Sequence, residues 1–414
     1  MPDELPSIPP HKQADPQGVP AWLVWILAAV GLLLLLQQLQ GSLLLFMRSP
    51  INPDIAGFMS DARQMQAFYD CPTREPFQVL WFKAGLLFSQ DTELVARVTT
   101  LLQTVLAGLL VLLFGRRFFG DIAGLTALYL FAVNPIVHYY GVSGMRAPLF
   151  CALLLLFGLC LFDVWRPRRR TLQSVLAGIA GGLLILTRAY SYVIVAGAFA
   201  VWFLTNRGWR PEFRRQAARH LLIAALVVAA LVVPDLLLRP PSPIHGQTVN
   251  FWRNLEFHGD PGTWQSDPPV SHFRYLFLEH SPAHVVLRVA GNYARYAFQY
   301  LPHFMRGYEW LWWLFPVGLV ASFFTRKEFA VALWIFSLAH VVFIMNLNQV
   351  PGSSGIENRY VFQAYPLALL LVIHGLLFLI DRLSRLIPAR FAKMDSVRRR
   401  LQPILFSATS PPAH

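Results

Sequence analysis

The stretch LLIAALVVAALVVPDLLL, residues 221–238, contains a single acidic residue, Asp235, and no basic residue. A second stretch, YVFQAYPLALLLVIHGLLFLI over residues 360–380, contains no Asp, Glu, Lys or Arg. A helix needs about 20 predominantly apolar residues to cross the hydrocarbon core of a bilayer, which is roughly 30 Å thick. Neither stretch alternates apolar and polar residues as the strands of a transmembrane barrel do. The two stretches predict an all-α protein that spans a membrane.

Similar apolar blocks recur along the chain, which is 55% hydrophobic and 14% charged. A soluble domain has about 25% charged residues, so the composition also favours a polytopic membrane protein. We predict ten spans. They cover residues 22–42, 95–114, 120–139, 147–164, 172–187, 189–205, 219–238, 309–325, 328–346 and 360–380. Pro135 is expected to shorten or kink the third span, because proline cannot donate the helical hydrogen bond.

The distribution of charge predicts the orientation. With the N-terminus in the cytoplasm, the inner segments carry 21 of the 35 Lys and Arg residues and 9 acids, whereas the outer segments carry 14 basic residues and 13 acids. This asymmetry follows the positive-inside rule, although the outer loops are much longer. The net charge of +13 is therefore explained by membrane orientation, and we do not expect a nucleic acid partner.

The spans divide the chain into three predicted parts. Residues 1–20 form a Pro-rich, disordered cytoplasmic tail, residues 21–381 form the transmembrane domain, and residues 382–414 form a basic cytoplasmic tail. Two long outer loops, residues 48–94 and 239–308, interrupt the domain, and loops of this length usually carry function. Each contains a segment that we interpret as an interfacial helix, Phe77–Phe88 and His280–Gln299.

The first outer loop contains a cluster of candidate catalytic charges. A carboxylate at a low-dielectric boundary can hold a raised pKa and act as a general base. Arg binds phosphate through two hydrogen bonds, and Lys binds it as a point charge. The charges of this loop that we single out are Asp54, Asp61, Arg63, Arg74, Glu75 and Lys83. The alternative is that they are ordinary solvated loop charges that pair with one another.

Three arginines lie at the predicted outer ends of spans: Arg146, Arg188 and Arg359. Arginines at such positions often extend the guanidinium to the interface. A charge that faces the bundle is instead a candidate functional group. All three are expected on the same side of the membrane as Asp54.

A metal centre is not predicted. The three cysteines, Cys71, Cys151 and Cys160, form neither a CxxC pair nor a disulfide framework. His280 and His284 are four residues apart and can share a helical face, but the sequence around them has no carboxylate pattern. We assign no cofactor with certainty and leave a divalent metal open as an alternative.

A series of short motifs occurs in an order known from one superfamily. An acidic residue follows the first span, an aromatic residue lies four positions later, and a proline opens an interfacial helix. Next come an Arg in the second span, a basic turn and a Gly-rich span that ends in LTR. A proline before the large loop and an RY pair follow. These motifs are Asp54, Phe58, Glu75-Pro76, Arg97, GRRFFG (115–120), GIAGGLLILTR (178–188), Pro234, Arg359-Tyr360 and Pro366. In this order they resemble the GT-C membrane glycosyltransferases, specifically the bacterial relatives of protein O-mannosyltransferases and aminoarabinose transferases.

The resemblance implies a glycosyltransferase that takes a hexosyl or pentosyl group from a polyprenyl-phosphate carrier. It would act with inversion on a glycan, lipid or protein acceptor at the outer face of the cell membrane, as in a bacterial inner membrane with the site facing the periplasm or exterior. Asp54 would be the base, alone or with Asp61. The cations that would neutralise the departing phosphate are Lys83, Arg74, Arg188, Arg359 and Arg146, and Glu75 and Arg63 would serve the acceptor side of the loop.

The sequence departs from the family pattern in the first loop. Ile55 follows Asp54 where the family often has Asp-Glu, Phe58 replaces the usual Tyr, and Glu75 replaces a common Pro. The large C-terminal soluble domain of some relatives is not expected in this chain. Two alternatives therefore stay open: a lipid-linked sugar transporter or flippase, and a non-catalytic scaffold of the cell envelope. The predicted spans keep their charges at their ends and show no inverted repeat, which argues against a transporter.

Overall fold

The computed structural model of the chain describes residues 20–47, 53–71, 75–162, 170–188, 191–205, 211–238, 249–250, 253–254, 256–260, 262, 266–271, 274–325 and 362–386. Within these ranges the regular structure is helical and includes no strand, so the predicted all-α fold is confirmed. The longer helices are α1 (Ala21–Phe46), α2 (Pro53–Gln64), α3 (Pro76–Leu86), α4 (Thr92–Phe119), α5 (Asp121–Val133), α6 (Pro135–Gly141), α7 (Ala147–Phe162), α8 (Arg170–Ile185), α9 (Ser191–Thr205), α10 (Pro211–Leu238), α12 (Pro282–Arg295), α14 (Leu314–Thr325) and α17 (Tyr365–Leu386). Shorter helical turns are η1 (Arg274–Leu278), η2 (Tyr296–Tyr300), α13 (Leu301–Phe304), η3 (Glu309–Leu311) and η4 (Phe362–Ala364).

Nine of the ten predicted spans coincide with helices, and the remaining one, residues 328–346, lies outside the described residues. Among the residues that the structure describes, four helical stretches are each long and apolar enough to cross a bilayer: Ala21–Phe46, Thr92–Phe119, Ala218–Leu238 and Phe362–Leu383. The shorter apolar helices α7 and α8 have 16 residues each. The chain is a polytopic helical membrane protein.

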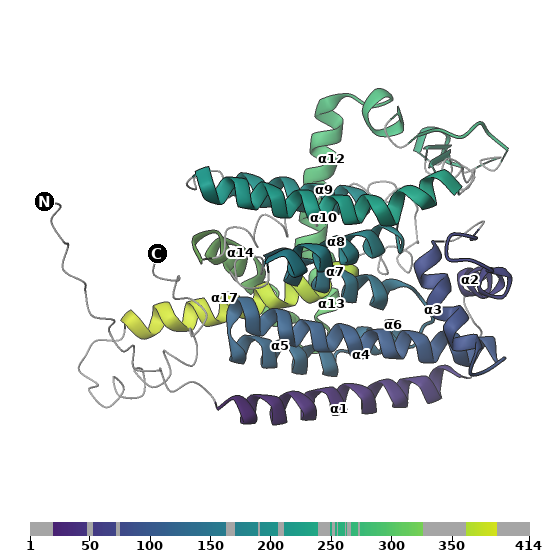
Figure 1. The fold of residues 1–414 in the computed structure, drawn as a ribbon. Helices are drawn as coiled ribbons and strands as arrows, with labels where there is room; N and C mark the ends of the chain where they lie inside the picture. Colours follow the sequence, from purple (N-terminus) through teal and green to yellow (C-terminus); the bar gives the residue numbers. More distant parts are fainter. Residues whose placement is uncertain are drawn as a thin grey trace, which may run out of the picture.

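The spanning helices form one bundle in which α4 is central (Figure 1). Helix α4 packs against α1, α5 and α7, while α8 packs between α7 and α10, and α17 packs against α14. Helices α2 and α3 lie together at one end of the bundle, and the C-terminal end of α17 lies at the opposite end. Helix α12 runs across the long axis of the bundle helices, in the direction expected of a helix parallel to the membrane plane.

Glycines allow some of these helices to approach each other closely. A Cβ atom built on Gly318 of α14 would lie 1.8 Å from the carbonyl oxygen of Leu371 in α17, and one built on Gly375 of α17 would lie 2.4 Å from the carbonyl oxygen of Leu314. Small residues at helix contacts are the usual way in which membrane helices pack, because lipid offers no hydrophobic driving force between them.

The third predicted span is broken where Pro135 predicts a kink. Helices α5 and α6 meet at Asn134 with a bend of 70°. The Asn134 side chain, which is fully buried, restores the hydrogen bonds of the break: its Oδ1 accepts from Ile136 N (2.8 Å) and Val137 N (3.3 Å). Its Nδ2 donates to the carbonyl oxygen of Phe304 (2.6 Å) and contacts the hydroxyl groups of Tyr308 (2.8 Å) and Tyr365 (2.9 Å). One amide therefore connects the bent span to α13 and α17.

Replacing Asn134 with Leu is expected to lower the free energy of unfolding by about 2 to 4 kcal/mol, because several buried polar groups lose their partner at once. Chemical denaturation of the detergent-solubilised protein would measure the change. The replacement of the exposed Tyr192 with Phe serves as the control and is expected to have no effect. Equal stability of the two variants would contradict the structural role of Asn134.

Candidate functional site

The first outer loop folds as two helices with a small apolar core of their own. Helices α2 and α3 pack together, and side chains from both bury one another against the start of α4. The core residues are Ile55, Phe58, Met59, Ala62, Met65, Cys71, Val79, Phe82, Leu86, Val95 and Ala96. The segment Phe77–Phe88 that we interpreted as an interfacial helix corresponds to α3. The loop is thus a structured platform at one end of the bundle.

An ion pair attaches this platform to the bundle. Glu75, which precedes α3 and is 8% exposed, binds the guanidinium of Arg146 through Oε2. Arg146 lies in the turn between α6 and α7, and its guanidinium carbon is 5.5 Å from the ring centroid of Phe58 on α2. A cation at this distance from an aromatic ring is attracted by the ring's quadrupole. Arg146 therefore contacts both helices of the first outer loop.

Arg188 lies close to the same place. The backbone N–H of Phe77, two residues after Glu75, donates to the carbonyl oxygen of Leu186 in the turn that ends α8 (3.3 Å). Arg188 is only 2% exposed, and its guanidinium carbon is 5.9 Å from the ring centroid of Phe150 on α7. The structure thus places Glu75 of the first outer loop at the same end of the bundle as Arg146 and Arg188, two of the three arginines that we expected on one side of the membrane.

Helix α4 and helix α2 both contact the turn that carries Arg146. Arg97 of α4 pairs with Glu93 (Nη2 to Oε1, 2.6 Å) and donates to the carbonyl oxygen of Val142 (3.3 Å). Gly144 has φ of +78°, and a Cβ atom built on it would lie 2.7 Å from Ile55 Cδ1. Only glycine fits this backbone conformation and this close contact without strain. The start of α2 is therefore packed directly against the Arg146 turn.

The other predicted site residues divide into three groups. Asp61 is buried on α2, and Arg63 is exposed at the end of the same helix. Lys83 donates from Nζ to the carbonyl oxygen of Met65 and so joins α3 to the end of α2. The side chain of Asp54, in the first turn of α2, lies outside the described part of the structure, as do Arg74 and Arg359. Their predicted roles stay predictions.

The platform also contacts α10. The hydroxyl of Tyr69, in the turn after α2, donates to the carbonyl oxygen of Leu231 (2.9 Å). Burial raises the pKa of Tyr69, and the nearby Asp235 carboxylate raises it further. The phenol therefore keeps its proton at neutral pH and remains a donor to α10.

The arrangement is suited to an anionic ligand. Arg146 and Arg188 come from different turns and lie at the end of an apolar bundle, and Arg188 is almost fully buried. They lie next to α2, the helix that carries Asp54. In a low-dielectric environment a fixed guanidinium attracts a phosphate more strongly than it does in water.

The second outer loop contains features that the sequence did not reveal. Glu256 lies beside His280 and His284, although 24 positions separate it from the first of these histidines. A separate polar cavity of about 690 Å³ opens nearby. Its lining includes Asn250, Arg253, Asn254, Asp267 and Arg274. Neither feature follows from local spacing, because each joins residues from distant parts of the loop.

A family model supports the predicted resemblance. Residues 74–237, which include Glu75, Arg146 and Arg188, match the model described as dolichyl-phosphate-mannose-protein mannosyltransferase. Among curated protein sequences, none matches this chain.

Solved structures extend the comparison to most of the chain. ArnT from Cupriavidus metallidurans bound to undecaprenyl phosphate aligns with a TM-score of 0.53 at 18% identity over 88% of this chain, and apo ArnT with a TM-score of 0.52 at 18% identity over 86%. The oligosaccharyltransferase AglB from Archaeoglobus fulgidus, in complex with an inhibitory peptide and a dolichol-phosphate, aligns with a TM-score of 0.54 at 16% identity over 94%. The chain covers 63%, 59% and 55% of these three structures, respectively. The chain therefore has the fold of the GT-C membrane glycosyltransferases, and the resemblance predicted from its sequence motifs is confirmed at the level of the fold.

Proposed function

We propose that the chain transfers a sugar from a polyprenyl-phosphate carrier to an acceptor at the outer face of the membrane. The observation that carries the proposal is that the Glu75–Arg146 ion pair and the turn that carries Arg188 lie at the same end of the bundle as α2. The GT-C fold supports it, because ArnT and AglB have been solved with undecaprenyl phosphate and dolichol-phosphate, respectively. A lipid donor requires a site at a membrane surface, and this bundle end offers cations there.

In the proposed reaction Asp54 accepts the proton of the acceptor hydroxyl. The hydroxyl oxygen then forms a bond to the anomeric carbon with inversion, and the bond from that carbon to the lipid phosphate oxygen breaks. The phosphate gains negative charge as it leaves, so fixed cations stabilise the transition state more than the bound donor. Arg188 and Arg146 are the cations in the described region that we assign to this role, while Arg74, Lys83 and Arg359 remain further candidates.

Glu75 has a positioning role in this proposal. Its carboxylate binds Arg146, so the guanidinium is held in one orientation before the donor arrives. Preorganised charges avoid the reorganisation that water requires during the reaction. With both termini in the cytoplasm, as the charge distribution predicts, this bundle end faces the periplasm or the exterior.

Replacing Asp54 with Asn is expected to reduce transfer about 10²- to 10⁴-fold, since the base is lost while size and polarity are retained. Mass spectrometry of envelope glycans would measure sugar transfer in cells that lack the gene and are complemented with each variant. Asp70→Asn, an exposed aspartate in the same loop, is the matched control and should retain the product. Loss of product in Asp61→Asn with retention in Asp54→Asn would instead make Asp61 the base.

Replacing Arg188 with Gln is expected to weaken the binding of undecaprenyl phosphate roughly 10- to 100-fold, because one charge-assisted hydrogen bond is lost. Binding to the protein in nanodiscs can be followed by native mass spectrometry, with undecaprenol as the ligand that lacks the phosphate. Arg116→Gln is the control, since Arg116 pairs with Asp121 (2.7 Å) across the turn between α4 and α5. Equal losses in the two variants, or equal affinity for undecaprenol, would refute a phosphate contact of Arg188.

A double-mutant cycle tests the ion pair. Glu75→Gln and Arg146→Gln are each expected to destabilise the protein by about 1 to 3 kcal/mol, because the remaining charge stays partly buried without its partner. The double variant should lose less free energy of unfolding than the sum of the losses of the two single variants. Chemical denaturation of the solubilised protein measures this coupling, and additive losses would show that the pair does not hold the first outer loop.

A further inference from the structure

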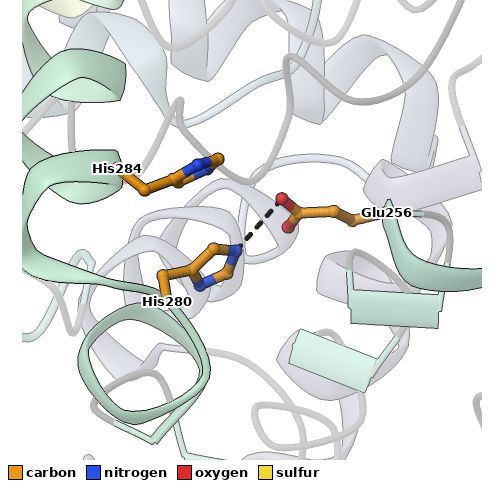
Figure 2. A group of neighbouring side chains, drawn as sticks. All are labelled: Glu256, His280 and His284. Carbon is orange, nitrogen blue, oxygen red and sulfur yellow. Dashed lines mark hydrogen bonds and ion pairs between the residues drawn. The ribbon is translucent and has the colours of Figure 1, made fainter.

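We propose that Glu256, His280 and His284 bind a divalent transition-metal ion, with zinc the best fit, in the second outer loop. The site is independent of the proposed glycosyl transfer and lies on different elements. Glu256 belongs to the helical segment 256–258, His280 follows η1, and His284 lies in the first turn of α12. One ligand atom from each of the three side chains lies within 4.8 Å of the other two, and Figure 2 shows the side chains converging.

Zinc binds imidazole nitrogens at about 2.0–2.1 Å and carboxylate oxygens at about 2.0–2.2 Å. Two ligand atoms of one tetrahedral ion are therefore about 3.3 Å apart. His280 Nε2 is 3.1 Å from Glu256 Oε1, so this pair already has close to the required separation. The ligand nitrogen of His284 lies within 4.8 Å of the other two ligand atoms, and its exposed side chain has room to rotate toward the ion.

Hydrogen bonds orient the ligands toward the proposed ion. His280 Nδ1 lies 2.7 Å from the carbonyl oxygen of Tyr275, and a carbonyl only accepts, so Nδ1 must carry the ring proton. The opposite nitrogen, Nε2, then faces the carboxylate of Glu256. The hydroxyl of Tyr275 donates to the other carboxylate oxygen, Oε2. Metal-binding histidines usually donate their second N–H to a carbonyl or carboxylate in this way.

Charge also favours a cation between these groups. A neutral His280 ring would direct a lone pair at the negative Glu256 oxygen, which is repulsive unless a proton or a metal ion lies between them. Glu279, the residue before His280, is held by other partners, because Arg253 (2.7 Å) and Arg274 (3.4 Å) pair with it. Imidazole ligands favour zinc and similar metals over magnesium and calcium, which prefer oxygen.

The site is built into packed structure rather than spread over a surface. Tyr275 is fully buried, and the His280 side chain is 6% exposed. The His280 ring stacks on Phe257, with 5.6 Å between centroids and 26° between planes, and on His284, with 4.9 Å and 26°. Since His284 is on the solvent side, three protein ligands leave a fourth tetrahedral position for water. The ion would join the segment around Glu256 to the start of α12.

Zinc binding can be measured directly. The full chain, without a polyhistidine tag, is stripped with EDTA in nanodiscs and titrated with Zn²⁺ against a chromophoric indicator. We expect each chain to bind one Zn²⁺ ion tightly. The substitutions His284→Ala and Glu256→Gln should each weaken this affinity at least about 10-fold. Tyr275→Phe keeps the packing but removes the hydrogen bond to Glu256, and it is expected to weaken binding about 10- to 100-fold. Co²⁺ in place of Zn²⁺ should give the intense visible absorption of a tetrahedral complex in the wild type and not in His284→Ala.

His258→Ala is the matched control, because His258 is exposed in the same loop and lies outside the cluster. It is expected to bind zinc as the wild type does. Absence of a tight equivalent in the wild type would overturn the proposal, as would wild-type affinity in both His284→Ala and Glu256→Gln. These outcomes are distinct from failure of the proposed function, because the readout is metal binding and does not require sugar transfer.

Discussion

The ion pair between Glu75 and Arg146 is the constraint on which the rest of the candidate site depends. Glu75 belongs to the first outer loop and Arg146 to a turn of the bundle, so this pair fixes the loop relative to the membrane. The second attachment, from Phe77 N–H to the Leu186 carbonyl, places the same loop beside Arg188. These two attachments join residues that are 71 positions apart (Glu75 and Arg146) and 109 positions apart (Phe77 and Leu186) in the sequence. Each of these groups lies in a turn or cap directly at the end of a helix, so the helices of the bundle set its position.

The bend at Asn134 illustrates a second constraint, which is the absence of water inside a bilayer. A broken helix leaves backbone N–H groups without partners, and lipid cannot satisfy them. Asn134 accepts two of these N–H groups and uses its own amide nitrogen to contact α13 and α17. The turn that follows α6 carries Gly144 and Arg146. The break therefore redirects the chain toward the site, and the Asn134 side chain replaces the backbone hydrogen bonds that the break removes.

Much of the fold could be predicted from the sequence because the bilayer sets a simple rule of length and apolarity. Nine of the ten predicted apolar spans coincide with described helices, and Pro135 predicted the bend in the third span. The site was harder to predict, because contacts between distant residues have no local signal. Lys83 illustrates this: no local pattern indicates that its ammonium group donates to the carbonyl oxygen of Met65, 18 positions earlier. The pairing of Glu256 with His280 was missed for the same reason, since no spacing rule connects a helical segment to a residue 24 positions later.

The shortness of α7 and α8 has a consequence for the depth of the site. At a rise of 1.5 Å per residue, 16 residues extend about 24 Å, which is less than the roughly 30 Å of bilayer hydrocarbon. The sequence between the two helices carries Arg166, Arg168 and Arg169, and Arg170 begins α8; hydrocarbon excludes such a cluster of charges. The shortfall must then occur at the other ends, where Arg146 and Arg188 lie. Arg146 and Arg188 adjoin those ends, so the short spans hold both guanidinium groups closer to the hydrocarbon than helices of full spanning length would.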